Sequence, residues 1–147
     1  MNFRSFRSAV WIRQLRDATM KERSHVDRCL ARLTKICLAL PEAICEVKGR
    51  HAAFIVRKET FAYFLNDHHG DGIVSVCSKA LPGDNVHLVS ANPEKFYLPA
   101  YIGPRGWVAL RLDRGDVDWA EVKELVLGSF LATAPRKLAS FAKDRSE

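Results

Sequence analysis

The clearest pattern along the chain is one apolar stripe at helical spacing that begins near residue 24. Its members recur at steps of three and four residues: Val26, Leu30, Leu33, Cys37 and Leu40. Ser24, with Asp27 three residues later, has the form of a capping box. Pro41 disfavours the helical conformation in the residue before it. The stripe therefore predicts an amphipathic helix from Ser24 to about Leu40 with one buried face.

From Ile44 the hydrophobic period changes to two, which is typical of strands with one buried face. Four short segments rich in Ile, Val, Phe and Tyr are separated by turn residues: 44–49, 51–58, 60–66 and 73–80. A parallel crossover needs about a dozen residues, and the turns here are shorter. We therefore expect the four segments to pair as antiparallel strands.

The second half of the chain holds further helices and strands. The spacing predicts a short helix at 82–90, an extended segment at 95–102, a strand at 107–113 and a last helix after Asp118. Asp118 is predicted to cap that helix, because Glu121 stands at the capping-box position. This order predicts an α+β fold, a two-layer domain in which helices pack on one face of an antiparallel sheet.

The 147 residues suit one domain, and a hydrophobic content of 48% lets that domain bury its own core. The formal net charge of +6 is unevenly distributed. Residues 1–23 contain six basic and two acidic residues, a balance of +4, which leaves +2 for residues 24–147. We therefore divide the chain into a basic N-terminal extension, 1–23, and a domain, 24–143. The modest charge of the domain weakens any argument from the high pI of the chain to nucleic acid.

The extension has three interpretations that the residues alone leave open. Phe3, Phe6 and Val10, and more loosely Trp11, fall at helical spacing among arginines. This pattern is typical of a basic amphipathic arm that touches nucleic acid or an acidic membrane surface. It is equally compatible with a helix that packs or frays. In the third interpretation translation starts at Met20, and the arm is an artefact of gene prediction.

The cysteines and the hydropathy indicate a cytoplasmic protein. No C-x-x-C pair or zinc-ribbon spacing occurs among Cys29, Cys37, Cys45 and Cys77, so we expect buried thiols in a reducing compartment. No apolar run approaches the ~20 residues that span a bilayer. Arginines interrupt any signal-peptide core near the N-terminus. We expect no membrane partner.

The sequence predicts no catalytic residue, no metal site and no cofactor. Asp67, His68, His69 and Asp71 offer ligand atoms, but they lie in one glycine-containing loop rather than in separated segments. We expect a solvated hairpin loop there. The serines of the predicted strands lack a G-x-S-x-G elbow, and the scattered glycines form no phosphate-binding fingerprint.

The segment from Gly103 to Trp107 is the most distinctive stretch. Its two glycines and one proline predict a tight turn that presents Arg105 just before a strand. Along that strand Trp107 and Arg111 lie on one face. The residues on either side of each in the sequence point to the other face, toward the core. An aromatic ring flanked by cations can stack on bases and neutralise phosphates. In the alternative interpretation Trp107 covers a sheet edge and Arg111 pairs with an acid.

A second basic cluster is predicted at the ends of strands. Arg57 and Lys58 end one predicted strand, and Lys79 ends another. Basic hairpin tips are what a winged DNA-binding module requires, because strand loops lie along the phosphate backbone. Basic strand ends also protect sheet edges from pairing with other chains, and that interpretation stays open.

Seven short segments together resemble one known family. Leu40–Ala43 is similar to its L-P-E-A/T junction, and Phe54–Ala62 to its F-x-V-x-x-K-x-F-A hairpin. The other similar segments are Val74–Lys79, Tyr101–Val108, Asp118–Trp119, Ser129–Phe130 and Ala134–Leu138. In this combined order, over residues 24–140, the chain resembles the MmcQ/YjbR family of small, predicted DNA-binding proteins. The N-terminal extension has no counterpart in the family pattern.

The resemblance implies a compact two-layer domain, similar to secretion chaperones and frataxin-like proteins, and a double-wing mode of DNA binding. Our hypothesis is a non-enzymatic DNA-binding protein. Its predicted contacts are Arg57, Lys58, Lys79, Arg105 and Arg111, with Trp107 as a stacking residue. The alternative is a protein-interaction module of the same chaperone-like fold, whose partner is another protein.

Overall fold

The computed structural model describes the backbone of residues 3–146 and the side chains of residues 10–145. Within these residues, strands form one antiparallel sheet in the order β1-β2-β3-β4-β6-β5. The strands are β1 (Ile44–Lys48), β2 (His51–Val56), β3 (Glu59–Asn66), β4 (Val74–Lys79), β5 (Phe96–Tyr97) and β6 (Trp107–Arg111). The helices are α1 (Phe3–Leu38), α2 (Asp84–Ala91), α3 (Trp119–Thr133) and α4 (Arg136–Ser146), with short 3-10 turns at His68–Gly70 and Gly103–Arg105. The predicted α+β class is confirmed.

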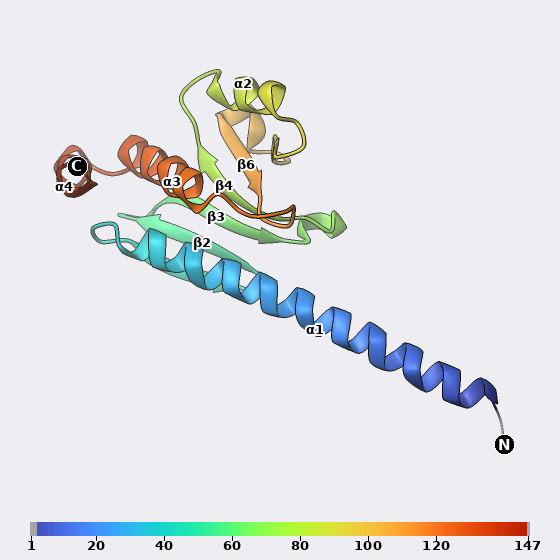
Figure 1. The fold of residues 1–147 in the computed structure, drawn as a ribbon. Coiled ribbons are helices and arrows are strands. Elements are labelled where there is room, and N and C mark those ends of the chain that lie inside the picture. The colour runs from blue at the N-terminus through green and yellow to red at the C-terminus, as the bar shows by residue number, and fades with distance from the viewer. Residues whose placement is uncertain (1–2, 147) are drawn as a thin grey trace.

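The main core lies between the sheet and the helices α1 and α3, which lie on one side of it (Figure 1). Phe64, Val76 and Leu110 are register partners across β3, β4 and β6, and each is at most 2% exposed. Leu33 of α1 and Phe130 of α3 complete this core and are fully buried. As the strand pattern predicts, every second residue of these strands therefore lies on the face of the sheet that the helices cover.

The prediction that a helix begins at Ser24 is wrong. Helix α1 runs without a break from Phe3 to Leu38, because no glycine or proline interrupts the sequence between these residues. The Ser24 hydroxyl accepts a hydrogen bond from Arg28 at 2.8 Å and caps nothing. The division of the chain into an extension and a domain at residue 24 stays a prediction. Helix α1 continues across this position without a break.

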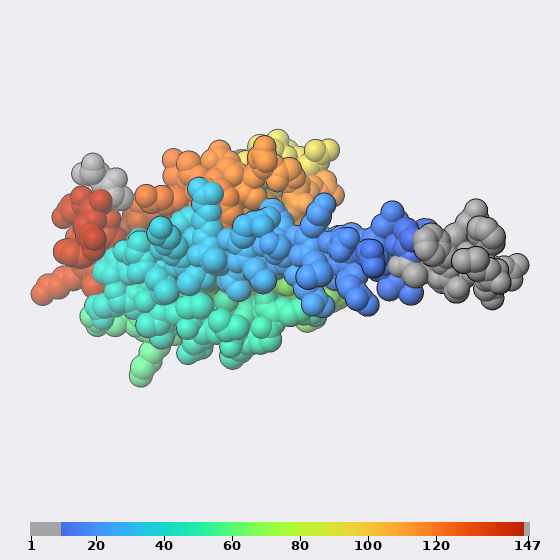
Figure 2. Space-filling model, turned by 60° about the horizontal axis from the view of Figure 1, so that its bottom comes forward, coloured from blue at the N-terminus to red at the C-terminus, as the bar shows by residue number. Residues whose placement is uncertain are grey.

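The N-terminal half of α1 extends beyond the sheet, on the side away from α4 (Figure 1), and Figure 2 shows it projecting from the body of the protein. Side chains from residue 10 to residue 24 are exposed, and burial begins with Cys29. Phe3 and Phe6, which start the predicted amphipathic stripe, have side chains outside the described residues.

The N-cap predicted for the last long helix is confirmed. The Asp118 carboxylate accepts a hydrogen bond from the backbone N–H of Glu121 at 3.2 Å, at the start of α3. The predicted short helix also exists, as α2. Its Leu88 and Val89 pack against the main core. The helices therefore lie on the core side of the sheet and leave the second face to other segments.

The second face of the sheet carries a smaller apolar cluster of Leu65, Cys77, Trp107 and Ala109. Tyr63 from the sheet, together with Tyr97 and Ile102, packs against this cluster. No helix contributes to this cluster among the described residues. The second face is therefore part core and part surface.

One buried hydroxyl replaces a strand pair where β3 meets β4. The register of these strands proceeds by one residue per step and ends at Ala62 opposite Ser78, so Phe61 and Lys79 would form the next pair. Instead, the Ser129 hydroxyl of α3 donates to the Phe61 carbonyl at 2.6 Å and accepts from the Lys79 N–H at 2.9 Å. A bulge in the β2–β3 register lies at the same point, between Phe54 and Ile55.

Replacing Ser129 with alanine should destabilise the protein. Ser129→Ala leaves the backbone groups of Phe61 and Lys79 without their partner, and such orphaned groups cost about 1–3 kcal/mol. The free energy of unfolding, measured by urea denaturation, is therefore expected to fall by about 2 kcal/mol. Ser140→Ala, at an exposed position of α4, is the control and should change it little. Equal stabilities of the two variants would contradict a structural role for the Ser129 hydroxyl.

Candidate nucleic-acid interface

Four of the predicted binding residues, Lys58, Lys79, Arg105 and Trp107, line one groove of about 570 Å³. Lys58 comes from the β2–β3 turn, Lys79 from the end of β4, and Arg105 from the 3-10 turn before β6. The remaining wall is supplied by Glu59, Thr60, Tyr63, Ile102, Ala132 and Thr133. The chain thus brings three cations from three separate segments to one place.

The groove is strongly basic. Within the part of the chain that the structure describes, Lys58, Lys79 and Arg105 form no ion pair. Glu59 is the single carboxylate that lines the groove, against these three cations. Three positive charges held near one another without carboxylate partners make a local field that favours an anion.

Lys58 reaches the groove through a strained turn. Arg57 and Lys58 connect β2 to β3 with φ angles of 47° and 70°, so both central residues of this tight turn are in the left-handed region. Such turns match the twist of the strands, but they strongly favour Asn-Gly, because side chains with a Cβ are strained there. Two basic residues therefore occupy positions where stability alone would select others.

The turn that carries Arg105 is held by a buried side-chain amide. The Asn85 side chain of α2 donates to the Gly103 carbonyl at 2.9 Å and to the Trp107 carbonyl at 3.2 Å. Asn85 is 5% exposed, and the two carbonyls it binds stand on either side of Arg105. Gly106 adopts a φ of 94°, which residues other than glycine rarely tolerate. The turn that presents Arg105 is therefore held in place by the Asn85 side chain.

Arg57, although adjacent to Lys58, is directed elsewhere. Its guanidinium makes two hydrogen bonds to the Glu42 carboxylate, at 2.8 and 2.9 Å. Hydrogen bonding to Arg57 holds the pKa of the exposed Glu42 carboxyl below its usual value. Arg57 does not line the groove, so the structure separates it from its neighbour in the predicted cluster.

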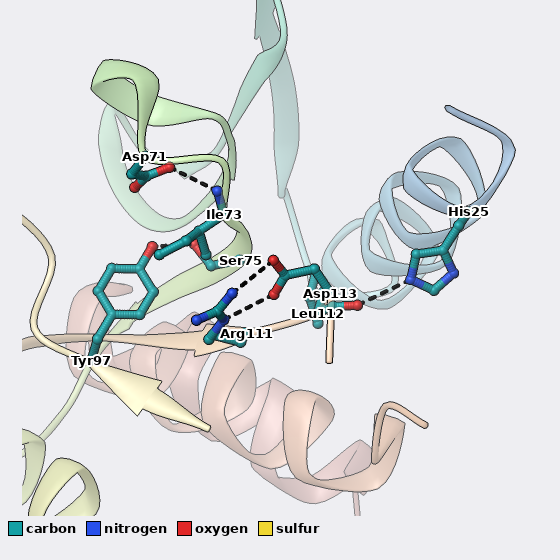
Figure 3. Close-up of polar contacts among 8 residues, drawn as sticks. All are labelled: His25, Asp71, Ile73, Ser75, Tyr97, Arg111, Leu112 and Asp113. Atoms are coloured by element: carbon teal, nitrogen blue, oxygen red, sulfur yellow. Dashed lines mark hydrogen bonds and ion pairs between the residues drawn. The ribbon is translucent and has the colours of Figure 1, made fainter. Parts of the chain in front are cut away.

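Arg111 is also paired with an acid. It donates from two nitrogens to the two oxygens of Asp113, each at 3.0 Å, and Figure 3 shows the pair facing one another at the end of β6. Their side chains are 19% and 20% exposed. Burial raises the pKa of Asp113, but the hydrogen bonds and charge of Arg111 outweigh it, so the carboxyl titrates below its usual range.

Trp107 lines the groove from beneath and is only 8% exposed. Its ring packs in the second-face cluster and lies 5.3 Å from the ring of Tyr63. The interpretation in which Trp107 covers the sheet therefore describes this structure, and its low exposure leaves little ring face for a base. Tyr63, which is half-buried above it, is the aromatic side chain with more room to contact a ligand.

A buried Cys–His contact tests the possibility of nucleophilic chemistry. Nε2 of His25 lies 3.6 Å from Sγ of Cys29. The same nitrogen lies 3.1 Å from the Leu112 carbonyl oxygen, a contact that Figure 3 shows. A carbonyl only accepts hydrogen bonds, so a proton on Nε2 satisfies it, and that nitrogen then has no lone pair for the thiol. Burial raises the pKa of the Cys29 thiol, which further disfavours a thiolate.

Among the described residues, no three side chains of His, Cys, Asp or Glu lie close enough together to hold a metal ion. In the Asp67–Gly72 loop the carboxylates serve the backbone instead: Asp67 accepts from Gly72 and Asp71 accepts from Ile73. Likewise, no helix described here is long and apolar enough to cross a membrane.

Sequence reasoning missed the residues that organise this face. Ser129 and Asn85 gave no signal beyond the resemblance, because their roles depend on contacts 50 and 18 residues away. Tyr63, Tyr97 and Tyr101 were visible only as strand or turn residues. The shared face of Tyr63 on β3 and Tyr97 on β5 could have been inferred from the strand alternation once the order β3-β4-β6-β5 was known, whereas Tyr101 lies in a turn outside these strands.

Together, the antiparallel sheet, the helices on its core face and the basic groove at one end of the sheet define a small two-layer α+β domain with one candidate anion-binding site. The YjbR family model matches residues 38–132, and the chain belongs to this family. It is similar in fold to the crystal structure of the Deinococcus radiodurans protein DR2400, which carries the family-model domain DUF419. That likeness has a TM-score of 0.56 at 24% sequence identity, over 68% of this chain and 74% of that one. No curated protein matches the chain.

Arg111→Gln should lower stability in a pH-dependent way. The folded-state pKa of Asp113 is depressed, so its contribution is present above the unfolded pKa of about 3.9 and is lost as pH falls through the folded pKa. We expect the variant to be less stable by about 1–2 kcal/mol at pH 7, with the difference from wild type shrinking toward pH 3. Urea denaturation at both pH values checks this, with the exposed Arg114→Gln as control. A difference that stays constant with pH would contradict the assignment.

Proposed function

We propose that this protein is a non-enzymatic DNA-binding protein that holds phosphates in the groove formed by Lys58, Lys79 and Arg105. The observation that carries this proposal is the convergence of these three cations, from separate segments and without ion-pair partners in the described part of the chain. A DNA backbone supplies the regularly spaced negative charges that such a row of cations attracts.

The position of Lys58 at a hairpin tip supports the same proposal. A wing contacts DNA by laying a strand turn along the phosphate backbone, and the double-wing mode implied by the family resemblance requires basic tips. The strain at Arg57 and Lys58 adds weight, because residues held in unfavourable backbone regions concentrate at functional sites. A turn selected for stability would carry Asn-Gly at these positions.

The proposal uses fewer contacts than the sequence predicted. Arg57 and Arg111 are engaged with Glu42 and Asp113, and Trp107 is buried. Three phosphate contacts predict a slope of log K against log salt of about −3 from the groove. We place the protein in the cytoplasm, where its free thiols persist.

A protein partner is the second candidate function, and the edge of the sheet favours it. Strand β1 pairs only with β2 among the described strands. It exposes Ile44 and Val47, at 53% and 64%. An exposed edge of this kind can accept an added strand from another chain, while the charged Glu46 and Lys48 beside these residues limit non-specific pairing.

Removal of the three groove charges should reduce the salt dependence of DNA binding. We expect the Lys58→Gln, Lys79→Gln and Arg105→Gln triple variant to flatten the slope by about 2–3 relative to wild type, since each lost contact removes about 0.9. Fluorescence anisotropy with a short duplex over a salt series measures this slope. The control carries the same charge change at Arg114, Arg136 and Lys137, which are exposed and lie outside the groove. If both variants flatten the slope equally, the groove is not the binding site.

Lys58→Gly should separate binding from stability. Glycine relieves the strain at a φ of 70°, so the free energy of unfolding is expected to stay unchanged or rise by up to about 1 kcal/mol. Affinity for DNA is nevertheless expected to fall, because one phosphate contact is lost. Thermal or urea denaturation and anisotropy on the same sample measure both quantities. A variant that binds DNA as well as wild type would remove Lys58 from the proposed site.

A further inference from the structure

A second cavity adjoins the basic groove on the same face of the sheet. It has a volume of about 440 Å³ and shares Tyr63 and Ile102 with the groove as lining residues. Its volume falls within the range of small-molecule sites, about 300–1,000 Å³. The two spaces share these two side chains, so they are neighbours on the sheet.

Aromatic rings dominate the lining of this cavity. Five of its residues carry rings: Tyr63, Tyr97, Tyr101, His68 and His69. Leu65, Pro99, Ala100 and Ile102 supply the apolar remainder, and Asp71 is its single carboxylate. Ring walls with few polar groups favour a flat, aromatic ligand, since stacking gains contact area without needing specific hydrogen bonds.

The rim holds exposed rings in costly conformations. Tyr101 has a φ of 67° and is 83% exposed, and His69 has a φ of 55° with its ring 5.9 Å from that of Tyr101. Neither backbone conformation is favourable for a residue with a Cβ, and exposing a tyrosine gains no burial energy.

The cavity floor is rigid and uncharged. The Tyr97 hydroxyl and the Ser75 hydroxyl lie 2.8 Å apart in a hydrogen bond, which Figure 3 shows spanning β5 and β4. Burial raises the pKa of Tyr97 to about 12, so the phenol stays neutral near pH 7. A neutral, immobilised ring is suited to contact an uncharged ring of the ligand.

The charges around the two spaces are arranged with opposite signs. Lys58, Lys79 and Arg105 line the groove, whereas Asp71 lines the cavity. A phosphate is attracted to the first and repelled by the second, while the polar edge of a base can donate a hydrogen bond to a carboxylate. A ligand with an aromatic ring at one end and a phosphate at the other is therefore oriented by both.

We infer that the groove and the adjoining cavity together bind an unpaired nucleotide of a nucleic-acid strand, with the phosphate among Lys58, Lys79 and Arg105 and the base among Tyr63, Tyr97 and Tyr101. This inference rests on the proposed function and extends it to single-stranded or locally opened DNA. A base inside a duplex is stacked on both sides and paired at its edge, so it cannot enter the cavity without leaving the helix.

The experiment compares a short single strand, the duplex of the same length and a mononucleotide, each bound to the full-length chain in anisotropy or competition format. Tyr101→Gly is the principal variant, because glycine suits a φ of 67° and removes only an exposed ring. Phe141→Ala is the matched control, an exposed ring on α4 outside both spaces. A single strand carrying 2-aminopurine reports stacking directly through its fluorescence.

We expect the single strand to bind more tightly than the duplex, and Tyr101→Gly to weaken single-strand binding about tenfold while duplex binding is unchanged. The 2-aminopurine signal should change on binding to wild type and Phe141→Ala, and much less with Tyr101→Gly. Equal affinities for strand and duplex, or a Tyr101→Gly variant that binds the strand like wild type, would overturn the inference. If a mononucleotide binds as tightly as the strand, the inference that the ligand is a strand is overturned, and the ligand is a free nucleotide.

Failure of this inference and failure of the proposed function give different results. If Lys58→Gly and Arg105→Gln weaken both strand and duplex while Tyr101→Gly weakens neither, the groove holds phosphates and the cavity is not a base site. If the groove variants change neither ligand, the proposed function fails, and any residual affinity belongs to another part of the chain.

Discussion

The Ser129 hydroxyl is the contact on which the functional face depends. It stands between the Phe61 carbonyl and the Lys79 N–H, where continued pairing would otherwise close β3 onto β4. The two strands are thereby joined through α3 rather than directly at this end of the sheet. The groove lies at the same end, and its wall includes Lys79 and the last residues of α3. A helix–sheet contact in the core thus lies at the same end of the sheet as the groove.

Three of the six described non-glycine residues with positive φ line the two spaces: Lys58 at the groove, and His69 and Tyr101 at the cavity. All three present long or aromatic side chains at angles that favour glycine. Each costs on the order of 1 kcal/mol, which the main core can offset because Phe54, Phe64 and Phe130 are fully buried.

Much of the fold was predictable because it is local. The strand alternation gave β1 to β4 and β6, and the Asp118 cap gave the start of α3. The continuous α1 was missed because a capping-box pattern at Ser24 outweighed the simple lack of any helix breaker before it. The site was only half predictable, since a basic residue looks the same in sequence whether its partner, such as Glu42 or Asp113, is near or far.

Net charge is a poor guide to where this protein would hold an anion. Most of the +6 lies in residues 1–23, and the rest of the chain has only +2. Within it, however, Arg57 and Arg111 are neutralised by acids, whereas Lys58, Lys79 and Arg105 share one groove with Glu59 alone. Electrostatic attraction falls off within about a Debye length of 10 Å, so a phosphate at the groove responds to those few charges. Two arginines of the domain are thus paired with acids, whereas the three cations of the groove lie beside the aromatic cavity without an ion pair in the described part of the chain.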